Sequence, residues 1–250
     1  MATLNPVEIG GGQVTYTPAA GQARLVLPAQ THRAYCDAQL DDYSRGPRRR
    51  FPDQAPLRLH LRARASHAQP AGTLGFGFWN DPFTLSGRAL SAPNAVWFFY
   101  ASAPSDMALA DGVPGRGWKA ATLNAGRYPG LLLAPAALAA VALARVPGLG
   151  APIMAAGRRV AQAREALLDD VALTDWHTYT LEWRTGEAVF SVDGAPRLRS
   201  AAPPRGPLGF VLWIDNQYAI AAPDGRFGFG LCALAETQWL EVDGLTLTAG

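Results

Sequence analysis

The 250-residue chain has few charged residues, and the charges it has nearly cancel. Charged residues make up 17% of the chain and the formal net charge is +2, against a usual charged share of about 25%. A chain this apolar does not stay disordered, and its small net charge gives no electrostatic ground for binding nucleic acid. Only one of the 22 basic residues is a lysine, Lys119, which we interpret as the bias of a GC-rich genome.

Cysteine and long apolar runs are also scarce. The only thiols, Cys36 and Cys232, lie near opposite ends of the chain, and we expect both to be buried and reduced. An uninterrupted apolar run of about 18 residues is missing, which argues against a membrane span. The N-terminus has no basic start followed by an apolar stretch, so no signal peptide is seen and a cytoplasmic location is expected.

Glycine and proline are plentiful, with 26 and 20 residues. They separate short segments whose residue patterns are typical of β-strands. Residues 57–65 alternate apolar and polar side chains, which is typical of a strand with one buried face. Residues 73–79 and 94–101 are nearly all apolar and are predicted to be central strands covered on both faces. Residues 185–187 and the pair Asp193 and Gly194 are predicted to be hairpin turns between such segments. Many such segments at short spacing predict an all-β fold, in which residues 1–250 form one jelly roll of two antiparallel sheets.

The stretch 128–170 interrupts this pattern with two predicted helices. Residues 131–146 are helix-prone and carry a single charge, and an amphipathic helix is expected over about 152–169. This insertion could pack on the sheet as a second small core or cover a ligand cleft as a lid. Contact with a membrane through 131–146 is a further, less favoured interpretation.

Several strand patterns are similar to those of a known family. Residues 176–184, followed by 188–194, resemble a strand pair of the concanavalin A-like lectin/glucanase superfamily, and most closely the family-16 glycoside hydrolases. Residues 75–80 and 240–247 resemble two further strands of that family. The resemblance covers about two thirds of the chain and omits 128–170, and it implies a concanavalin A-like β-sandwich without establishing an activity.

The resembling enzymes carry a Glu, an Asp and a second Glu on a central strand. Retaining hydrolysis needs two carboxyl groups about 5 Å apart, one as nucleophile and one as acid. Residues 94–101, which should hold these acids, contain no carboxylate, and no Glu occurs between Glu8 and Glu165. The resemblance therefore implies the fold of these enzymes without their catalytic acid motif.

Two predicted strands end in a tryptophan followed by polar side chains, and alternation places Trp213 and Asp215 on one face of their strand. Such an arrangement suits a ligand that stacks on the indole ring and forms hydrogen bonds beside it. If the fold brings them together, Asp81 and Asp215 are the candidate catalytic acids. The candidate ligand-binding residues are Trp79, Asn80, Trp97, Phe99, Tyr100, Trp213, Asn216 and Gln217.

A possible metal ligand comes only from the resemblance. Asp243 falls where the family often places a structural calcium ligand on its last strand, although it could equally belong to an Asp-Gly hairpin turn. Asp37, Gln39 and Asp41 share one face of a predicted strand, where they could act as ligands or be solvated. No other cofactor is predicted.

These observations leave functions of different classes open. The first is a glucanase-like sandwich that binds a small molecule such as a saccharide in its concave cleft, with non-standard or no glycoside hydrolase activity. The alternative is binding or conversion of an apolar, lipid- or isoprenoid-like molecule in an aromatic pocket covered by the helical insertion. A third interpretation treats the insertion as a docking surface for a partner protein.

Overall fold

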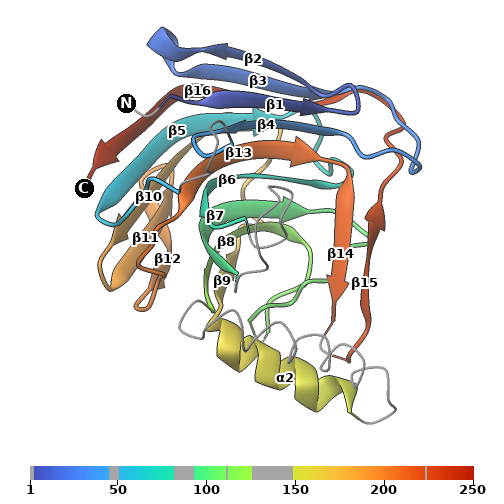
Figure 1. The fold of residues 1–250 in the computed structure, drawn as a ribbon, viewed down its shortest axis with the longest axis vertical. Helices are drawn as coiled ribbons and strands as arrows, with labels where there is room; N and C mark the ends of the chain where they lie inside the picture. Colours follow the sequence, from blue (N-terminus) through green and yellow to red (C-terminus); the bar gives the residue numbers. More distant parts are fainter. Residues whose placement is uncertain (1–2, 45–50, 82–92, 111, 126–148, 223) are drawn as a thin grey trace.

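Two antiparallel sheets lie face to face and form most of the molecule (Figure 1). The computed structural model describes all residues except 1–2, 45–50, 82–92, 111, 126–148 and 223. The inner sheet has the order β1 (Asn5–Ile9), β4 (Asp37–Asp41), β13 (Gly209–Asp215), β6 (Thr73–Trp79), β7 (Asn94–Ala101), β8 (Gly117–Asn124) and β9 (Arg164–Leu167). This architecture confirms the predicted all-β sandwich of two sheets.

The outer sheet covers one face of the inner sheet. Its order is β12 (Ala195–Ser200), β11 (Glu187–Val192), β10 (His177–Arg184), β5 (Leu57–Ala65), β16 (Gln238–Ala249), β3 (Gln22–Leu27) and β2 (Gln13–Thr17). A 3-10 turn, Pro18–Ala20, joins the last two strands in that order. The hairpin β14 (Gln217–Ala221) and β15 (Phe227–Leu231) leaves the sandwich and runs toward helix α2 (Gly150–Ala161), as Figure 1 shows.

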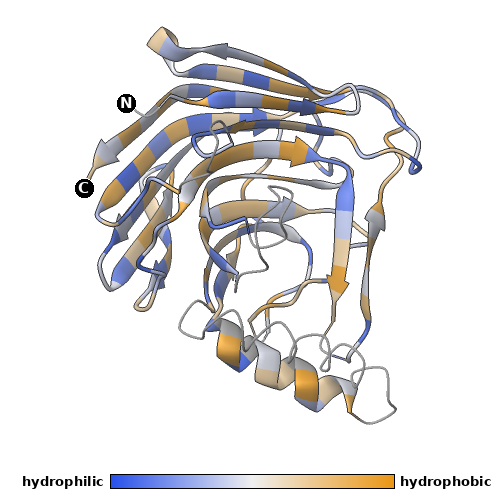
Figure 2. Cartoon of the chain, in the orientation of Figure 1, coloured by the Kyte–Doolittle hydropathy of each residue, from blue (hydrophilic) through white to orange (hydrophobic). Residues whose placement is uncertain are grey.

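The alternation expected for residues 57–65 is seen in β5. Leu59 and Leu61 are buried between the sheets, while Arg58 and Arg62 face outward. Figure 2 shows the same alternation of hydrophilic and hydrophobic bands along the outer sheet. Because side chains point to opposite faces at successive residues, this pattern fixes which face meets the inner sheet.

Aromatic rings fill the space between the sheets. Phe76 of β6 and Phe98 of β7 lie 5.4 Å apart between ring centroids, and each lies 5.1 Å from Tyr179 of β10 in an edge-to-face arrangement. Such pairs add to the stabilisation from buried area, which for one aromatic side chain is about 150–250 Å². The predicted central strands 73–79 and 94–101 are therefore confirmed, since their inward residues form the middle of the core.

The predicted hairpins follow β10 and β11. Asp193 and Gly194 both have positive φ, 50° and 79°, as a two-residue type I′ turn requires. The Asp193 carboxylate holds this turn by accepting hydrogen bonds from the Thr178 backbone N–H at 2.8 Å and the His177 ring at 2.6 Å. His177 thus has a structural role at the start of β10.

The inserted segment differs from the prediction at its C-terminal end. Helix α2 ends at Ala161 because Gln162 adopts the left-handed conformation, with φ 43°. The residues that follow, predicted as helix up to 169, form strand β9, whose backbone pairs with the otherwise open edge of β8. Backbone pairing at a sheet edge overrides the helical preference of this Ala- and Leu-rich stretch. The other predicted helix, 131–146, lies outside the described residues.

Within the part of the chain that the structure describes, no helix is long and apolar enough to cross a membrane.

Candidate functional site

The inner sheet has one face free of the outer sheet, and we call it the concave face because the sheet curves around it (Figure 1). On β7, Trp97 and Phe99 point to this face, whereas Phe98 and Tyr100 point into the core between the sheets. Tyr100 is only 5% exposed, so the prediction that it binds a ligand is wrong. Strand alternation explains the error, because neighbouring residues point to opposite faces.

Four aromatic side chains form a continuous surface on the concave face. We call this surface the aromatic floor and define it as Trp79, Trp97, Phe99 and Trp213. The Trp97 ring centroid lies 5.4 Å from those of Phe99 and Trp213 and 5.8 Å from that of Trp79. Trp79 and Trp97 are half-buried, while the other two rings are 8% exposed. The structure thus brings together four of the predicted ligand-binding residues.

Gly75 lies on β6, the strand between β13 and β7, and leaves room for the Trp213 ring to lie across the sheet. Gly75 pairs with Trp213 on one side and with Phe99 on the other. A Cβ atom at Gly75 would lie 2.7 Å from Cη2 of Trp213 and would also collide with the Phe98 carbonyl oxygen. The indole Nε1 donates a hydrogen bond to Oγ1 of Thr73 at 3.0 Å. A residue without a side chain is therefore required at position 75.

The opposite end of the floor is held by a tyrosine. The indole Nε1 of Trp79 donates to Oη of Tyr43 at 2.6 Å, and Gln39 reaches the same oxygen at 3.4 Å. Asn80 uses its side-chain oxygen to accept the backbone N–H of Asn94 at 2.9 Å, which closes the strand end. Tyr43 was not among the predicted site residues, because nothing in its local sequence places it beside a strand formed 36 residues later.

The two predicted catalytic acids do not meet. Strand β6 runs antiparallel to β13 in a register that pairs Asp215 with Thr73, at the start of β6, and Gly209 with Trp79, at its end. Asp81 follows Trp79, so eight residues separate it from the partner of Asp215, or roughly 20 Å or more at about 3.3 Å per strand residue. The proposed pairing of Asp81 with Asp215 as acid and base is therefore wrong.

Asp215 instead has Asp37 as its direct neighbour on β4. Opposed residues of antiparallel strands have Cβ atoms about 4.5–5.5 Å apart. Asp215 also accepts a hydrogen bond from Oγ1 of Thr73 at 2.7 Å and one from the Gln217 backbone N–H at 3.0 Å. Burial raises the pKa of Asp215 to about 6 against the opposing effect of these hydrogen bonds. Burial, and then the charges of Asp215 and Asp41, raises the pKa of Asp37 well above its usual range.

Asp37 and Asp41 of β4 are therefore buried. The interpretation that these side chains are solvated is wrong. Asp37 is 4% exposed and Asp41 is 0% exposed. The Asp41 carboxylate accepts hydrogen bonds from the Gln39 side chain at 2.6 Å and from the backbone N–H groups of Tyr43 and Ser44 at 3.1 and 2.8 Å. Through these hydrogen bonds the Asp41 side chain fixes the backbone that follows β4.

Asn216 has a structural role. Its side chain is fully buried, donates to the carbonyl oxygens of Ala34 and Cys232 at 3.0 and 3.1 Å, and accepts the Cys36 backbone N–H at 2.9 Å. Both donor hydrogens are used, so the prediction that it binds a ligand is wrong. Gln217 is half-buried and faces Tyr35, to which its side chain is hydrogen-bonded.

The predicted calcium ligand lies on the outer sheet, in contacts that do not suit a divalent cation. Asp243 accepts a hydrogen bond from the Gln22 side chain at 3.0 Å, and its other oxygen lies 3.8 Å from the Arg62 guanidinium. A cation would compete with this arginine. Among the described residues, no group of three or more His, Cys, Asp or Glu side chains is placed to hold a metal ion.

A buried ion pair lies beside the aromatic floor on the concave face. Nζ of Lys119 on β8 lies 3.1 Å from Oε1 of Glu165 on β9, and their side chains are 1% and 2% exposed. The second oxygen of Glu165 accepts the backbone N–H groups of Leu109 and Ala110 at 3.1 and 3.0 Å. The carboxylate thus neutralises the lysine and fixes a loop above the sheet. Sequence reasoning missed this pair because residue 165 was predicted to be helical.

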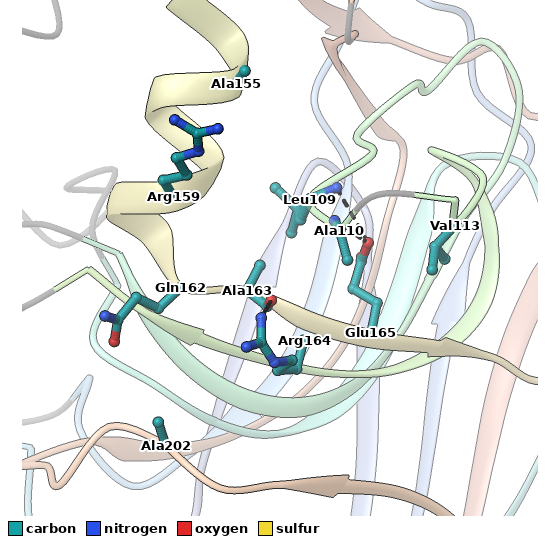
Figure 3. A pocket seen from close by; sticks show the side chains of 10 residues that line it. All are labelled: Leu109, Ala110, Val113, Ala155, Arg159, Gln162, Ala163, Arg164, Glu165 and Ala202. Atoms are coloured by element: carbon teal, nitrogen blue, oxygen red, sulfur yellow. Dashed lines mark hydrogen bonds between the residues drawn. The ribbon is translucent and has the colours of Figure 1, made fainter.

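A cavity of about 750 Å³ opens next to this ion pair, between α2, β9 and the loop that carries Leu109 (Figure 3). The described residues that line it are Leu109, Ala110, Val113, Ala155, Arg159, Gln162, Ala163, Arg164, Glu165 and Ala202. Ala163 belongs to a hydrophobic cluster against which Trp79, Trp97 and Leu109 pack. The cavity is therefore next to Trp79 and Trp97 through Ala163 and Leu109, while the two tryptophans do not themselves line it.

The described part of the insertion forms one wall of this cavity through Ala155 and Arg159 of α2. The lid predicted from 131–146 lies outside the described residues. None of the polar cavity residues was predicted as a site residue. In the sequence, Arg159 and Arg164 are marked only by their charge, as polar residues of the segment expected to form an amphipathic helix.

No protein-family model and no curated protein matches this chain. Among solved structures, the Emp47p carbohydrate recognition domain superposes with a TM-score of 0.50 and 11% identity, over 99% of this chain and 88% of that one. A Bacillus licheniformis β-glucanase gives 0.47 and 11%, over 100% and 92% of the two chains. A pseudo β-1,3-glucanase of Mycobacterium tuberculosis gives 0.49 and 11%, over 92% and 75%. At these identities the comparisons concern the fold alone, and the chain has the concanavalin A-like β-sandwich fold.

Proposed function

We propose that the protein binds a saccharide in the cavity beside the aromatic floor and does not hydrolyse it by the family-16 mechanism. The observation that carries this proposal is a cavity of about 750 Å³ with a largely polar lining, which shares Ala163 and Leu109 with the hydrophobic cluster around Trp79 and Trp97. Small-molecule sites are concave, span about 300–1,000 Å³, and combine apolar walls with a few polar groups. A sugar ring offers hydroxyl groups to the polar side chains of the lining and apolar C–H faces to Leu109 and Val113.

The polar lining supports a hydroxyl-rich ligand over an apolar one. Arg159, Gln162 and Arg164 bring guanidinium and carboxamide groups to the cavity. An apolar molecule in the same place would take water from these groups without replacing its hydrogen bonds, which is unfavourable. The lipid- or isoprenoid-like ligand is therefore the weaker candidate.

The acids of the site support binding without hydrolysis. Of the described residues that line the cavity, only Glu165 is acidic, and both its oxygens are already engaged by Lys119 and two backbone N–H groups. Strand β7 presents Trp97 and Phe99 to the concave face where the resemblance implied catalytic acids. Glycoside hydrolysis needs two carboxyl groups on either side of the scissile bond.

The experiment is a thermal-shift and calorimetric screen of the purified protein with neutral and charged oligosaccharides, and with a fatty acid and farnesol as apolar probes. A bound ligand raises the unfolding free energy by RT ln(1 + [L]/Kd). We expect an oligosaccharide to stabilise the protein and to remain uncleaved. Stabilisation by the apolar probes alone would overturn the proposal, and so would release of reducing ends.

A matched pair of variants on α2 locates the site. Ala155 lines the cavity, whereas the next residue, Ala156, is exposed and does not. Ala155→Trp fills the cavity and should abolish saccharide binding, while Ala156→Trp should leave the Kd unchanged. Equal binding by the two variants would place the ligand elsewhere.

A further inference from the structure

The cavity carries an excess of positive charge. Among the described residues that line it, three are ionisable, namely Arg159, Arg164 and Glu165. Because the Glu165 carboxylate is 3.1 Å from Nζ of Lys119, this acid is neutralised within the protein. The positive charges of the two arginines therefore remain for a ligand to neutralise, among the described residues that line the cavity.

Neither arginine has an acidic partner among the residues that the structure describes. Arg164 donates through Nη1 to the carbonyl oxygen of Ala163 at 3.1 Å, and its guanidinium has no other hydrogen-bond partner among the described residues. The side chain of Arg159 extends from α2 beside the cavity (Figure 3). By contrast, Arg24 and Arg64 of the outer sheet are both ion-paired with Glu241.

Unpaired guanidinium groups at a cavity favour one kind of ligand. The planar fork of an arginine matches a carboxylate or a sulfate group through two parallel hydrogen bonds. A neutral sugar can accept hydrogen bonds from these groups but leaves their charge without compensation. The arginines stand on different elements, Arg159 on α2 and Arg164 on β9, so they approach the cavity from two walls.

We propose that the cavity selects saccharides bearing an anionic group, a carboxylate or a sulfate, and that Arg159 and Arg164 recognise it. This inference rests on the saccharide-binding function proposed above and names the ligand class of that site. Arg159 and Arg164 act as binding residues, and no chemical step is assigned to them.

The experiment compares three probes with one backbone: cellotetraose, the same tetrasaccharide oxidised to the carboxylate at C6, and its C6-sulfated form. We expect at least one anionic form to bind about tenfold or more tightly than cellotetraose at low salt, a difference of about 1.4 kcal/mol. The advantage should shrink as salt rises, because salt screens exposed charges. Which of the two anionic forms binds more tightly identifies the group.

Arg159→Gln and Arg164→Gln should each weaken binding of the anionic probes much more than binding of cellotetraose, and so remove much of the anionic advantage. The control is Arg58→Gln, which removes the same charge from the exposed face of β5. Equal binding of neutral and anionic probes would overturn this inference but leave saccharide binding intact. The inference would also be overturned if Arg58→Gln weakened binding of the anionic probes as much as the cavity variants do. If none of the probes bound, the proposed function itself would be contradicted.

Discussion

Lys119 reaches diagonally across the strand pair β8–β9 to Glu165, and the resulting ion pair is closed off from solvent. Removing one partner of such a pair leaves a buried charge without compensation, which costs about 3–5 kcal/mol. We therefore expect Lys119→Met and Glu165→Gln each to lower the free energy of unfolding by about this amount in urea titrations.

The double variant separates the charge effect from lost packing. A glutamine at 165 can still accept the backbone N–H groups of Leu109 and Ala110, and a methionine at 119 fills a similar volume. The double variant should lose much less stability than the two single variants added together, since no unpaired charge remains. Additive losses would show that the ion pair itself contributes little.

A second prediction concerns pH, because the partly buried side chains of Asp42 and Asp53 lie near each other at the start of β13. Burial and then the neighbouring Asp53 raise the pKa of Asp42 to about 9, and burial raises that of Asp53. A group with a raised pKa holds its proton more tightly when folded. Its stabilising contribution is therefore complete at low pH and is lost as pH rises from about 4 to about 9.

The test is the urea midpoint at pH 5, 7 and 9. Asp42→Asn keeps an oxygen for the Phe210 N–H, which Asp42 accepts at 3.0 Å, and offers an amide donor to Asp53. This variant should lose less stability than the natural protein between pH 5 and 9, while Asp169→Asn, at an exposed position, should follow the natural protein. Parallel curves for all three proteins would rule out the acid pair as a source of the pH dependence.

A third prediction compares two glycines. Gly75→Ala places a methyl group against Trp213 and the Phe98 carbonyl oxygen, and overpacking of this kind costs about 1–3 kcal/mol. Gly157→Ala, on the exposed side of α2 with no atom within 4 Å of the added carbon, should stabilise the protein by up to about 1 kcal/mol. Urea unfolding measures both, and a shift of tryptophan fluorescence should accompany only the first. Equal stability of the two variants would contradict the close packing at Gly75.

The parts of the fold that could be predicted are those governed by local pattern. Alternation in 57–65 identified a half-buried strand, and Asp193 followed by Gly194 identified a hairpin. The same rule placed Trp213 and Asp215 on one face of a strand, which the register of β13 agrees with. These features depend on neighbours within a few residues, so the sequence contains them.

The site could not be predicted to the same extent, because its geometry depends on how distant strands align. Nothing local to Asp81 or Asp215 shows that they occupy opposite ends of paired strands, or that Asp37 lies opposite Asp215. Glu165 lies in a strand because its segment pairs with β8. Its ion-pair partner, Lys119, is 46 residues away in the sequence. Register between non-adjacent segments is a tertiary property, and hydrophobic pattern alone leaves it open.

The last prediction concerns the thiols. Cys36 and Cys232 are free and buried, as expected from the sequence, and burial raises the pKa of both. Since the thiolate is the reactive form, Ellman's reagent at pH 8 should label the native protein slowly and reach two thiols only after unfolding. Rapid labelling of the native protein would contradict the burial of these residues.

Asn216 provides the variant that tests this arrangement, because its side chain links the backbones of Cys36 and Cys232. Asn216→Ala leaves buried backbone groups without partners, at a cost of about 1–3 kcal/mol, and should speed labelling by allowing this edge of the sandwich to open. Asn124→Ala removes a comparable side chain, bonded to the Ala202 carbonyl at 3.1 Å, and should lower stability without the same effect on the thiols. If the thiols of the two variants reacted with Ellman's reagent at the same rate after correction for global unfolding, the hydrogen bonds of Asn216 would not protect Cys36 and Cys232 locally.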